Sequence, residues 1–259
     1  MRAALAIVPL LGGCHKLFSV EHAPVDAPPP PYRAEVLADE PVGYYRLGEA
    51  TGVSAVDETG GPPGQYVSTF RLGEPGAIAD DTDTAVFFGP GDTAVLFDDV
   101  HEFDGLKPFS IEAWVRPMHD GRFHNIAAKF VQPPAATGYI LYTLDRRLAF
   151  ARAVTEANQT LIEAQDALVP GVYQHVVATF DGTDMRLFVD GVQVGTKRSV
   201  VALPDQTVKF TIGSANGTAS SSTYHGLIDE VAIYDEALPP QRVFEHHAAA
   251  ITAPRPASR

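Results

Sequence analysis

The stretch GLIDEVAIY, residues 226–234, decides the fold. Its aliphatic residues and its terminal tyrosine predict a buried β-strand. Earlier segments resemble it. Residues 109–115 alternate Phe, Ile, Ala and Val with Ser, Glu and Trp at a period of two, and residues 173–180 form a further apolar run. Strands at such short intervals, without crossover helices, predict an antiparallel arrangement.

Residues 185–195 carry the clearest hairpin signal, two β-rich runs separated by Asp190-Gly191. Both central residues of a tight type I′ turn need positive φ, which Asp-Gly tolerates. We therefore expect Asp190 to be a turn residue and not a catalyst.

Other segments of the sequence predict further strands and one helix. We expect strands at 42–49, 84–88, 93–97, 138–144, 147–152, 160–163 and 210–213. Residues 51–75 are expected to be loop with short strands, one of them at 66–67. Residues 238–248 predict a short helix, with Pro240 in its first turn. The predicted fold class is all-β, an antiparallel two-sheet β-sandwich with a short C-terminal helix.

Composition limits the function classes. The chain has 259 residues, of which 45% are hydrophobic, enough for one large β-domain with short tails. The 22 glycines and 21 prolines suit many turns. A formal net charge of −13 disfavours nucleic acid as a partner.

The N-terminus predicts a lipid anchor. A short apolar run ends in Leu11-Gly12-Gly13-Cys14, which resembles the lipobox of bacterial lipoprotein signal peptides. We expect a signal peptide at 1–13, a lipidated Cys14, and a proline-rich tether over 14–33. The alternative is a chance apolar N-terminus with a buried thiol. His15 stands where an aspartate is associated with inner-membrane retention, so the expected location is the bacterial envelope, at the outer membrane or cell surface.

From about Val42 to Ala248, the order of the strands and their sequence motifs resemble the laminin-G-like, concanavalin A-like jelly-roll domains of bacterial surface proteins. The resemblance implies a jelly-roll domain over 34–250, followed by a disordered tail over 251–259. That family includes lectin-like binders, adhesion modules and domains attached to glycosidases. A shared fold does not fix the activity.

The sequence contains few of the residue patterns that catalysis would need. Glycoside hydrolysis needs two carboxyl groups facing one cleft, and alternate positions on a strand share a face. Glu112 stands alone in its strand, while Asp229 and Glu230 are adjacent and should point to opposite faces. The sequence has no Gly-x-Ser-x-Gly elbow and no His-Glu-x-x-His zinc motif. We therefore expect no catalytic residues.

Calcium is the metal that the resemblance implies. The family's closing-strand aspartate matches Asp229, and its glycine-rich loop matches Gly89, Gly91 and Asp92, with Gly-Pro here in place of Asp-Gly. Such a structural Ca²⁺ takes six to eight oxygen ligands. The alternative is that Asp229 caps a turn or forms a salt bridge.

The predicted task is non-catalytic recognition of a glycan or a cell-surface protein. Loops carry function more often than cores, and aromatic and amide side chains suit sugars. The candidate ligand-binding residues are Phe123, Asn125, Tyr139, Asn158, Asn216 and Tyr224. Trp114 is expected to pack in the sheet. A polysaccharide-active glycoside hydrolase and a structural subunit of an envelope complex remain the alternatives.

Overall fold

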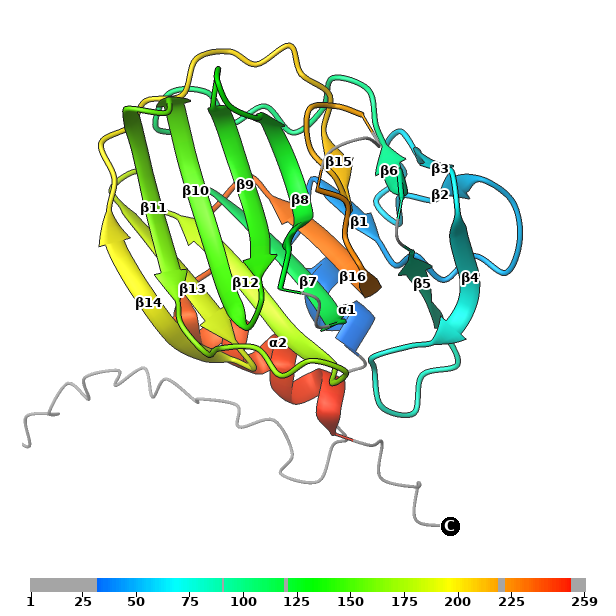
Figure 1. The fold of residues 1–259 in the computed structure, drawn as a ribbon. Helices are drawn as coiled ribbons and strands as arrows, with labels where there is room; N and C mark the ends of the chain where they lie inside the picture. Colours follow the sequence, from blue (N-terminus) through cyan, green and yellow to red (C-terminus); the bar gives the residue numbers. More distant parts are fainter. Residues whose placement is uncertain (1–31, 90, 119–120, 219–221, 253–259) are drawn as a thin grey trace, which may run out of the picture.

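In the computed structural model the described residues are 32–89, 91–118, 121–218 and 222–252. They form two antiparallel eight-stranded sheets packed face to face as a jelly-roll sandwich (Figure 1). Sheet A runs in the order β14 (Val192–Arg198), β13 (Asp184–Val189), β12 (Gln174–Phe180), β7 (Phe109–Pro117), β16 (Gly226–Tyr234), β5 (Thr84–Phe88) and β4 (Phe70–Pro75), with β1 (Gly43–Tyr45) also paired to β16.

Sheet B holds the remaining strands. Its order is β11 (Asn158–Ala164), β10 (Arg147–Thr155), β9 (Thr137–Leu144), β8 (Phe123–Val131), β15 (Thr211–Ile212), β6 (Ala94–Leu96), β3 (Gly64–Val67) and β2 (Ser54–Ala55). The predicted all-β sandwich is therefore confirmed.

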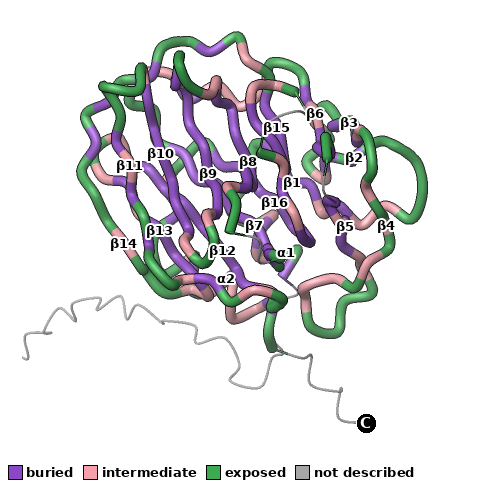
Figure 2. The backbone as a smooth tube through the Cα atoms, in the orientation of Figure 1, coloured by how far each residue is buried: buried purple, intermediate pink, exposed green. Residues whose placement is uncertain are grey.

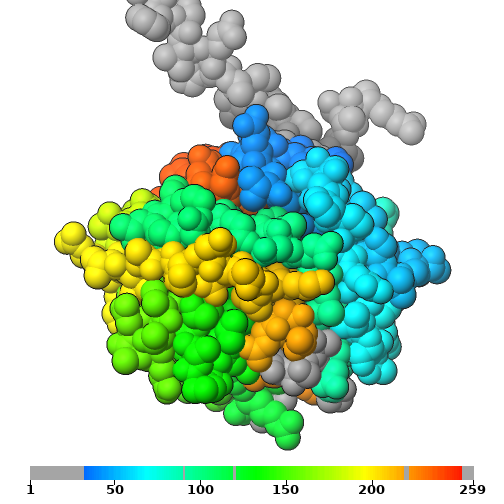
Figure 3. All heavy atoms as spheres, turned by 90° about the horizontal axis from the view of Figure 1, so that it is seen from above, coloured from blue at the N-terminus to red at the C-terminus, as the bar shows by residue number. Residues whose placement is uncertain are grey.

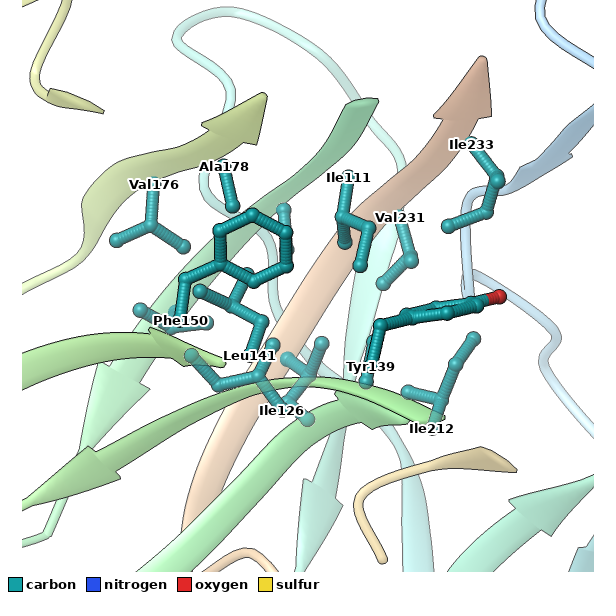
Figure 4. Packing of buried hydrophobic residues seen from close by; sticks show 14 of the residues in the cluster. Ile111, Ile126, Tyr139, Leu141, Phe150, Val176, Ala178, Ile212, Val231 and Ile233 are labelled. Atoms are coloured by element: carbon teal, nitrogen blue, oxygen red, sulfur yellow. The ribbon is translucent and has the colours of Figure 1, made fainter. Parts of the chain in front are cut away.

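The main core lies between the sheets. Side chains of sheet A, such as Ile111 and Val231, point toward Tyr139, Leu141 and Phe150 of sheet B (Figure 4). Each of these is almost completely buried. Fully burying such an apolar side chain contributes about 1.5–3 kcal/mol, so this layer is the main source of stability.

Two helices cover the outer face of sheet A, the face turned away from sheet B. Helix α1 (Tyr32–Ala38) and helix α2 (Pro240–Ile251) pack there with Trp114 and Tyr234 in a second apolar cluster. Both faces of β7 are consequently buried from Phe109 to Val115, while Arg116 stays exposed. The predicted packing role of Trp114 is confirmed, because its indole is 3% exposed and stacks on the His247 ring.

The strand and helix predictions hold best in the second half of the chain. β16 and β5 have the predicted bounds, α2 begins at Pro240, and Asp190 and Gly191 have φ of 51° and 76° in the predicted turn. Helix α1 was not predicted. The expected domain start at Ala34 falls inside this helix, since Tyr32 is already buried in it.

Three strands, the two-residue β2 and the longer β4 and β8, lie where loop was expected. β4 lies at the edge of sheet A, and its half-exposed residues, with Gly73 and Pro75, hide the strand pattern. β8 includes Phe123 and Asn125, which were expected to lie in a loop. The polar His124-Asn125 pair masked a strand that is buried on both faces.

A β-bulge changes the direction of Glu230. Its φ is 53°, and the β16–β7 register shifts between Asp229 and Ala232. Asp229 accepts a hydrogen bond from the Ala77 N–H, and Glu230 accepts one from the Tyr44 hydroxyl. Ala77 and Tyr44 both belong to the helix-covered cluster, so the two carboxylates share the outer side of sheet A. The expectation of opposite faces was wrong.

Loops from the two halves of the chain meet at one end of the sandwich. Segments 98–108 and 199–209 run side by side there (Figure 3), joined by hydrogen bonds between Gly105 and Leu203. The fully buried Arg152 donates to the Val201 and Gly105 carbonyls from below, at 2.9 Å each. The two paired segments therefore close this end of the sandwich.

The edge strand β14 differs from the central strands in solvent exposure. β14 is exposed along nearly its whole length, whereas the central strands are buried (Figure 2). No helix among the described residues is long and apolar enough to cross a bilayer. Cys14, the predicted signal peptide, the predicted tether up to residue 31 and the predicted tail from residue 253 lie outside the described residues.

Candidate functional site

Small side chains hollow the outer face of sheet B. On β10, Leu148, Phe150 and Arg152 point inward and alternate with alanines at 149, 151 and 153. Ala151 lies opposite Ile140 of β9, which lies opposite Ala128 of β8. Because alanine extends so little from the sheet, the face between the loops stays concave.

The concavity forms a groove of about 330 Å³. Ile140 and Ala151 form its floor, and the aromatic side chains of Phe123 and Tyr142 line one side. The other described lining residues are Phe130, Gln132, Pro133, Ala136, Glu156, Gln159 and Ser222. An apolar surface with a few convergent polar groups is typical of a small-ligand site.

Two aromatic rings make one wall. Phe123 of β8 and Tyr142 of β9 stack with centroids 4.1 Å apart and planes at 26°. Burial, and to a lesser degree the charge of Glu163, raises the pKa of Tyr142 to about 12, so its hydroxyl stays protonated at neutral pH. The wall thus offers ring faces and an uncharged hydrogen-bonding group.

Backbone contacts position the polar rim. The Asn216 side-chain carbonyl accepts a hydrogen bond from the Gln132 N–H at 2.5 Å, and the Ser222 carbonyl accepts one from the Asn125 N–H at 3.0 Å. Gln159 donates to the Glu156 carbonyl at 2.9 Å. The described part of the rim therefore presents amides, a hydroxyl and one carboxylate.

The structure brings some of the predicted ligand-binding residues to this groove. Phe123 lines it, Asn216 holds its rim, and the exposed Asn158 lies beside Gln159. Asn125 is buried and contributes through its backbone.

Tyr139 and Tyr224 do not reach the groove, because both are in the main core. The Tyr139 hydroxyl donates to the His101 carbonyl, and the Tyr224 ring packs edge-on against Phe88. Sequence reasoning missed Tyr142, Gln132 and Gln159. The alternation of alanine with large residues along β10 is a signal in the sequence that could have indicated a concave face, but it was not used.

The predicted calcium ligands do not form one site. Phe88 pairs with Gly226, so Gly89 and the loop containing Gly91 and Asp92 follow the end of β5. Asp229 lies three residues further along β16, about 10 Å away by strand rise. Among the described residues no cluster of three or more acidic, histidine or cysteine side chains fits a metal. These residues therefore do not fit the calcium site that the resemblance implied.

A buried acidic centre lies on the opposite sheet. The Glu112 carboxylate is fully buried under α1 and α2, where Tyr32 and Tyr234 donate to it at 2.9 and 2.8 Å. Nε2 of His175 lies 2.7 Å from it, and Nδ1 of His246 lies 3.0 Å from it. This centre is sealed by the helices and joins them to the sheet.

Charge sets the protonation of this centre. Burial by itself would raise the pKa of Glu112, but the charge of His246 and the hydrogen bond from His175 outweigh it and hold that pKa well below its usual value. Burial likewise works against a charged His246, yet the charge of Glu112 raises the pKa of His246. The pair therefore favours a carboxylate beside an imidazolium.

Family comparison agrees with the geometry. Residues 89–244 match the laminin G model described as the concanavalin A-like lectin/glucanases superfamily. The chain belongs to this superfamily. Over 117 residues it is 29% identical to human pappalysin-1, a match covering 43% of this chain and 7% of pappalysin-1.

Solved structures share the fold at low identity. The ligand-binding domain of botulinum neurotoxin serotype D in complex with N-acetylneuraminic acid has a TM-score of 0.58 at 10% identity, over 84% of this chain and 52% of that one. The binding domain of Paraclostridial Mosquitocidal Protein 1 has a TM-score of 0.58 at 13% identity, over 82% and 52%. The chain thus spans about half the length of these structures, and a small fraction of pappalysin-1.

Proposed function

We propose that this chain is a non-catalytic carbohydrate-binding module and that the groove on the outer face of sheet B holds a sugar unit. The observation that carries the proposal is the stacked Phe123–Tyr142 wall above an apolar floor with an amide rim. Ring faces accept the CH groups of a sugar, and amides exchange hydrogen bonds with its hydroxyls. Binding domains with the same fold support this assignment.

Charge favours a neutral sugar in this groove. Among its described lining residues Glu156 is the only charged side chain. No cation among these described residues would balance this acid beside a carboxylate-bearing sugar, so binding of such a sugar costs free energy.

The arrangement of acids favours binding over hydrolysis. Glu112, Asp229 and Glu230 are each at most 2% exposed and lie on sheet A, on the far side of the sandwich from the groove. Glycoside hydrolysis needs two carboxyl groups at the scissile bond. The described groove lining supplies one.

A glycan-array screen tests the proposal. The wild-type chain should bind a set of neutral glycans, and Gln159→Ala should lose at least ten-fold of that binding, since the amide contacts the ligand at the rim. Gln193→Ala is the matched control, because Gln193 is an exposed glutamine on β14 of the other sheet. A folded wild-type chain that binds no glycan, or equal losses in both variants, would contradict the proposal.

Anchoring through Cys14 is the second part of the proposal. It rests on the Leu11–Cys14 motif in the sequence. Helix α1, where the described chain begins, packs on sheet A, and the groove opens on sheet B. An anchor before α1 would therefore leave the groove on the side away from α1, available to glycans around the cell.

A further inference from the structure

Four side chains form a row on the part of the outer face of sheet A beside β4. Arg71 of β4 pairs with Phe87 of β5, Phe87 pairs with Leu227 of β16, and Leu227 pairs with Arg116 of β7. Directly paired residues in antiparallel strands point to the same face. The row therefore reads Arg–Phe–Leu–Arg across four adjacent strands.

Local contacts orient both guanidinium groups. The Arg71 guanidinium lies over the Phe87 ring, 4.2 Å from its centre, and Nε donates to Glu74 at 2.9 Å. Nε of Arg116 donates to the Gly171 carbonyl at 2.7 Å. Within the described part of the chain, no acceptor is bonded to the terminal nitrogens of either arginine. Each fork is held in place and keeps donors for a ligand.

The row borders a cavity of about 250 Å³. Phe87, Leu227 and Gly226 give it an apolar floor, and its described lining carries two guanidinium groups against the one carboxylate of Glu74. A local excess of positive charge contrasts with the formal charge of −13 on the whole chain. An arginine fork binds a carboxylate or a phosphate through two parallel hydrogen bonds, which the point charge of a lysine does not do.

We propose that this row is a second binding site, which takes the carboxylate groups of an acidic polysaccharide. Three strand spacings separate the two arginine backbones, about 14 Å. The arginines can therefore contact two carboxylates of one chain, while the apolar floor between them meets CH groups of the intervening sugar rings. Acidic groups that alternate with apolar ring faces are characteristic of a polyuronate chain. The site is on the opposite sheet from the groove and does not depend on the function proposed for it.

Polygalacturonate binding to the full chain, measured by calorimetry at low salt, tests the site. We expect binding that weakens with added salt, because exposed charge pairs are screened. The double variant Arg71→Gln with Arg116→Gln should lose at least ten-fold in affinity. Arg198→Gln, an exposed arginine on β14, should leave the affinity unchanged, as should the groove variant Gln159→Ala.

Other outcomes overturn the site. Equal affinity of the double variant and the wild type would remove the row from the binding surface. Polyglutamate binding as tightly as polygalacturonate would show that charge alone is recognised, without the ring contacts. Loss of affinity in Arg198→Gln would show diffuse attraction instead of a built site.

Discussion

Single residues decide where each sheet is open to a ligand. The short alanine side chains leave the outer face of β10 concave, and Phe123 contributes a partly exposed ring to the wall beside it. Elsewhere a missing side chain permits close packing. At Gly191 a Cβ would lie 3.2 Å from both the Phe244 Cα and the His247 Cβ of α2.

Replacing Phe123 tests the stacking role at the groove. Phe123→Leu keeps most of the apolar volume but removes the ring face, so glycan affinity should fall about ten-fold, the equivalent of about 1.4 kcal/mol. Surface plasmon resonance with glycans identified on the array would measure the change. An unchanged affinity would remove the aromatic wall from the site.

Gly191→Ala tests the contact between the hairpin turn and α2. Positive φ costs a non-glycine residue about 1–2 kcal/mol, and the tight contacts with α2 add to that cost. Urea unfolding should show a loss above that of Gly52→Ala. Gly52 has φ of 99° and open space around its Cα, so its variant isolates the backbone cost. Equal losses would show that α2 yields without cost.

At the scale of elements, the helices belong to the domain because Glu112 binds them both. Helix α1 is short, and nothing in its sequence has the apolar length that predicts a stable helix alone. It forms where Tyr32 reaches Glu112 and where Glu35 and Asp39 meet Arg242 of α2. Sequence reasoning therefore missed α1, since its stabilising partners lie far along the chain.

Stability should depend on pH through this centre. The pKa of Glu112 is lowered, so its contribution is present above its unfolded pKa of about 4.5 and is lost as pH falls through the folded value. The pKa of His246 is raised, so its contribution is present below about 6.5 and is lost as pH rises through the folded value. The contribution of the pair should therefore be largest between about pH 4.5 and 6.5.

Thermal unfolding across pH 4 to 9 checks this dependence. Glu112→Gln should lower the melting temperature most inside that window and flatten the profile. Glu163→Gln, an exposed acid on β11, should leave the profile of the wild type intact. A Glu112→Gln profile parallel to that of the wild type would mean that the centre does not titrate as described.

At the scale of the whole molecule, the two proposed binding surfaces lie on opposite sheets of the sandwich. The groove lies on sheet B, while the terminal helices and the arginine row lie on sheet A. Local patterns predicted the second-half strands, the hairpin and the last helix, because each depends on periodicity or turn chemistry. The groove depends on which strands become neighbours, so of its aromatic wall the sequence predicted only Phe123.

Anchoring is tested at this same scale. In bacterial cells, metabolic labelling with a palmitate analogue should mark the wild-type chain and leave Cys14→Ser unlabelled and released from the membrane fraction. Ser19→Ala, in the expected tether, should keep the label. Membrane association of Cys14→Ser equal to that of the wild type would contradict lipidation at this residue.

Mapping the bound glycan on the protein tests the central proposal most directly. Titration of an array-selected neutral oligosaccharide into ¹⁵N-labelled protein would show which amides respond. We predict that the largest chemical-shift changes fall on β8, β9, β10 and the 156–159 turn, and that Gln159→Ala needs at least ten-fold more glycan to produce them. Changes centred on α1 and α2 or on the Arg71–Arg116 row, with β8 to β10 silent, would contradict a sugar site in the groove.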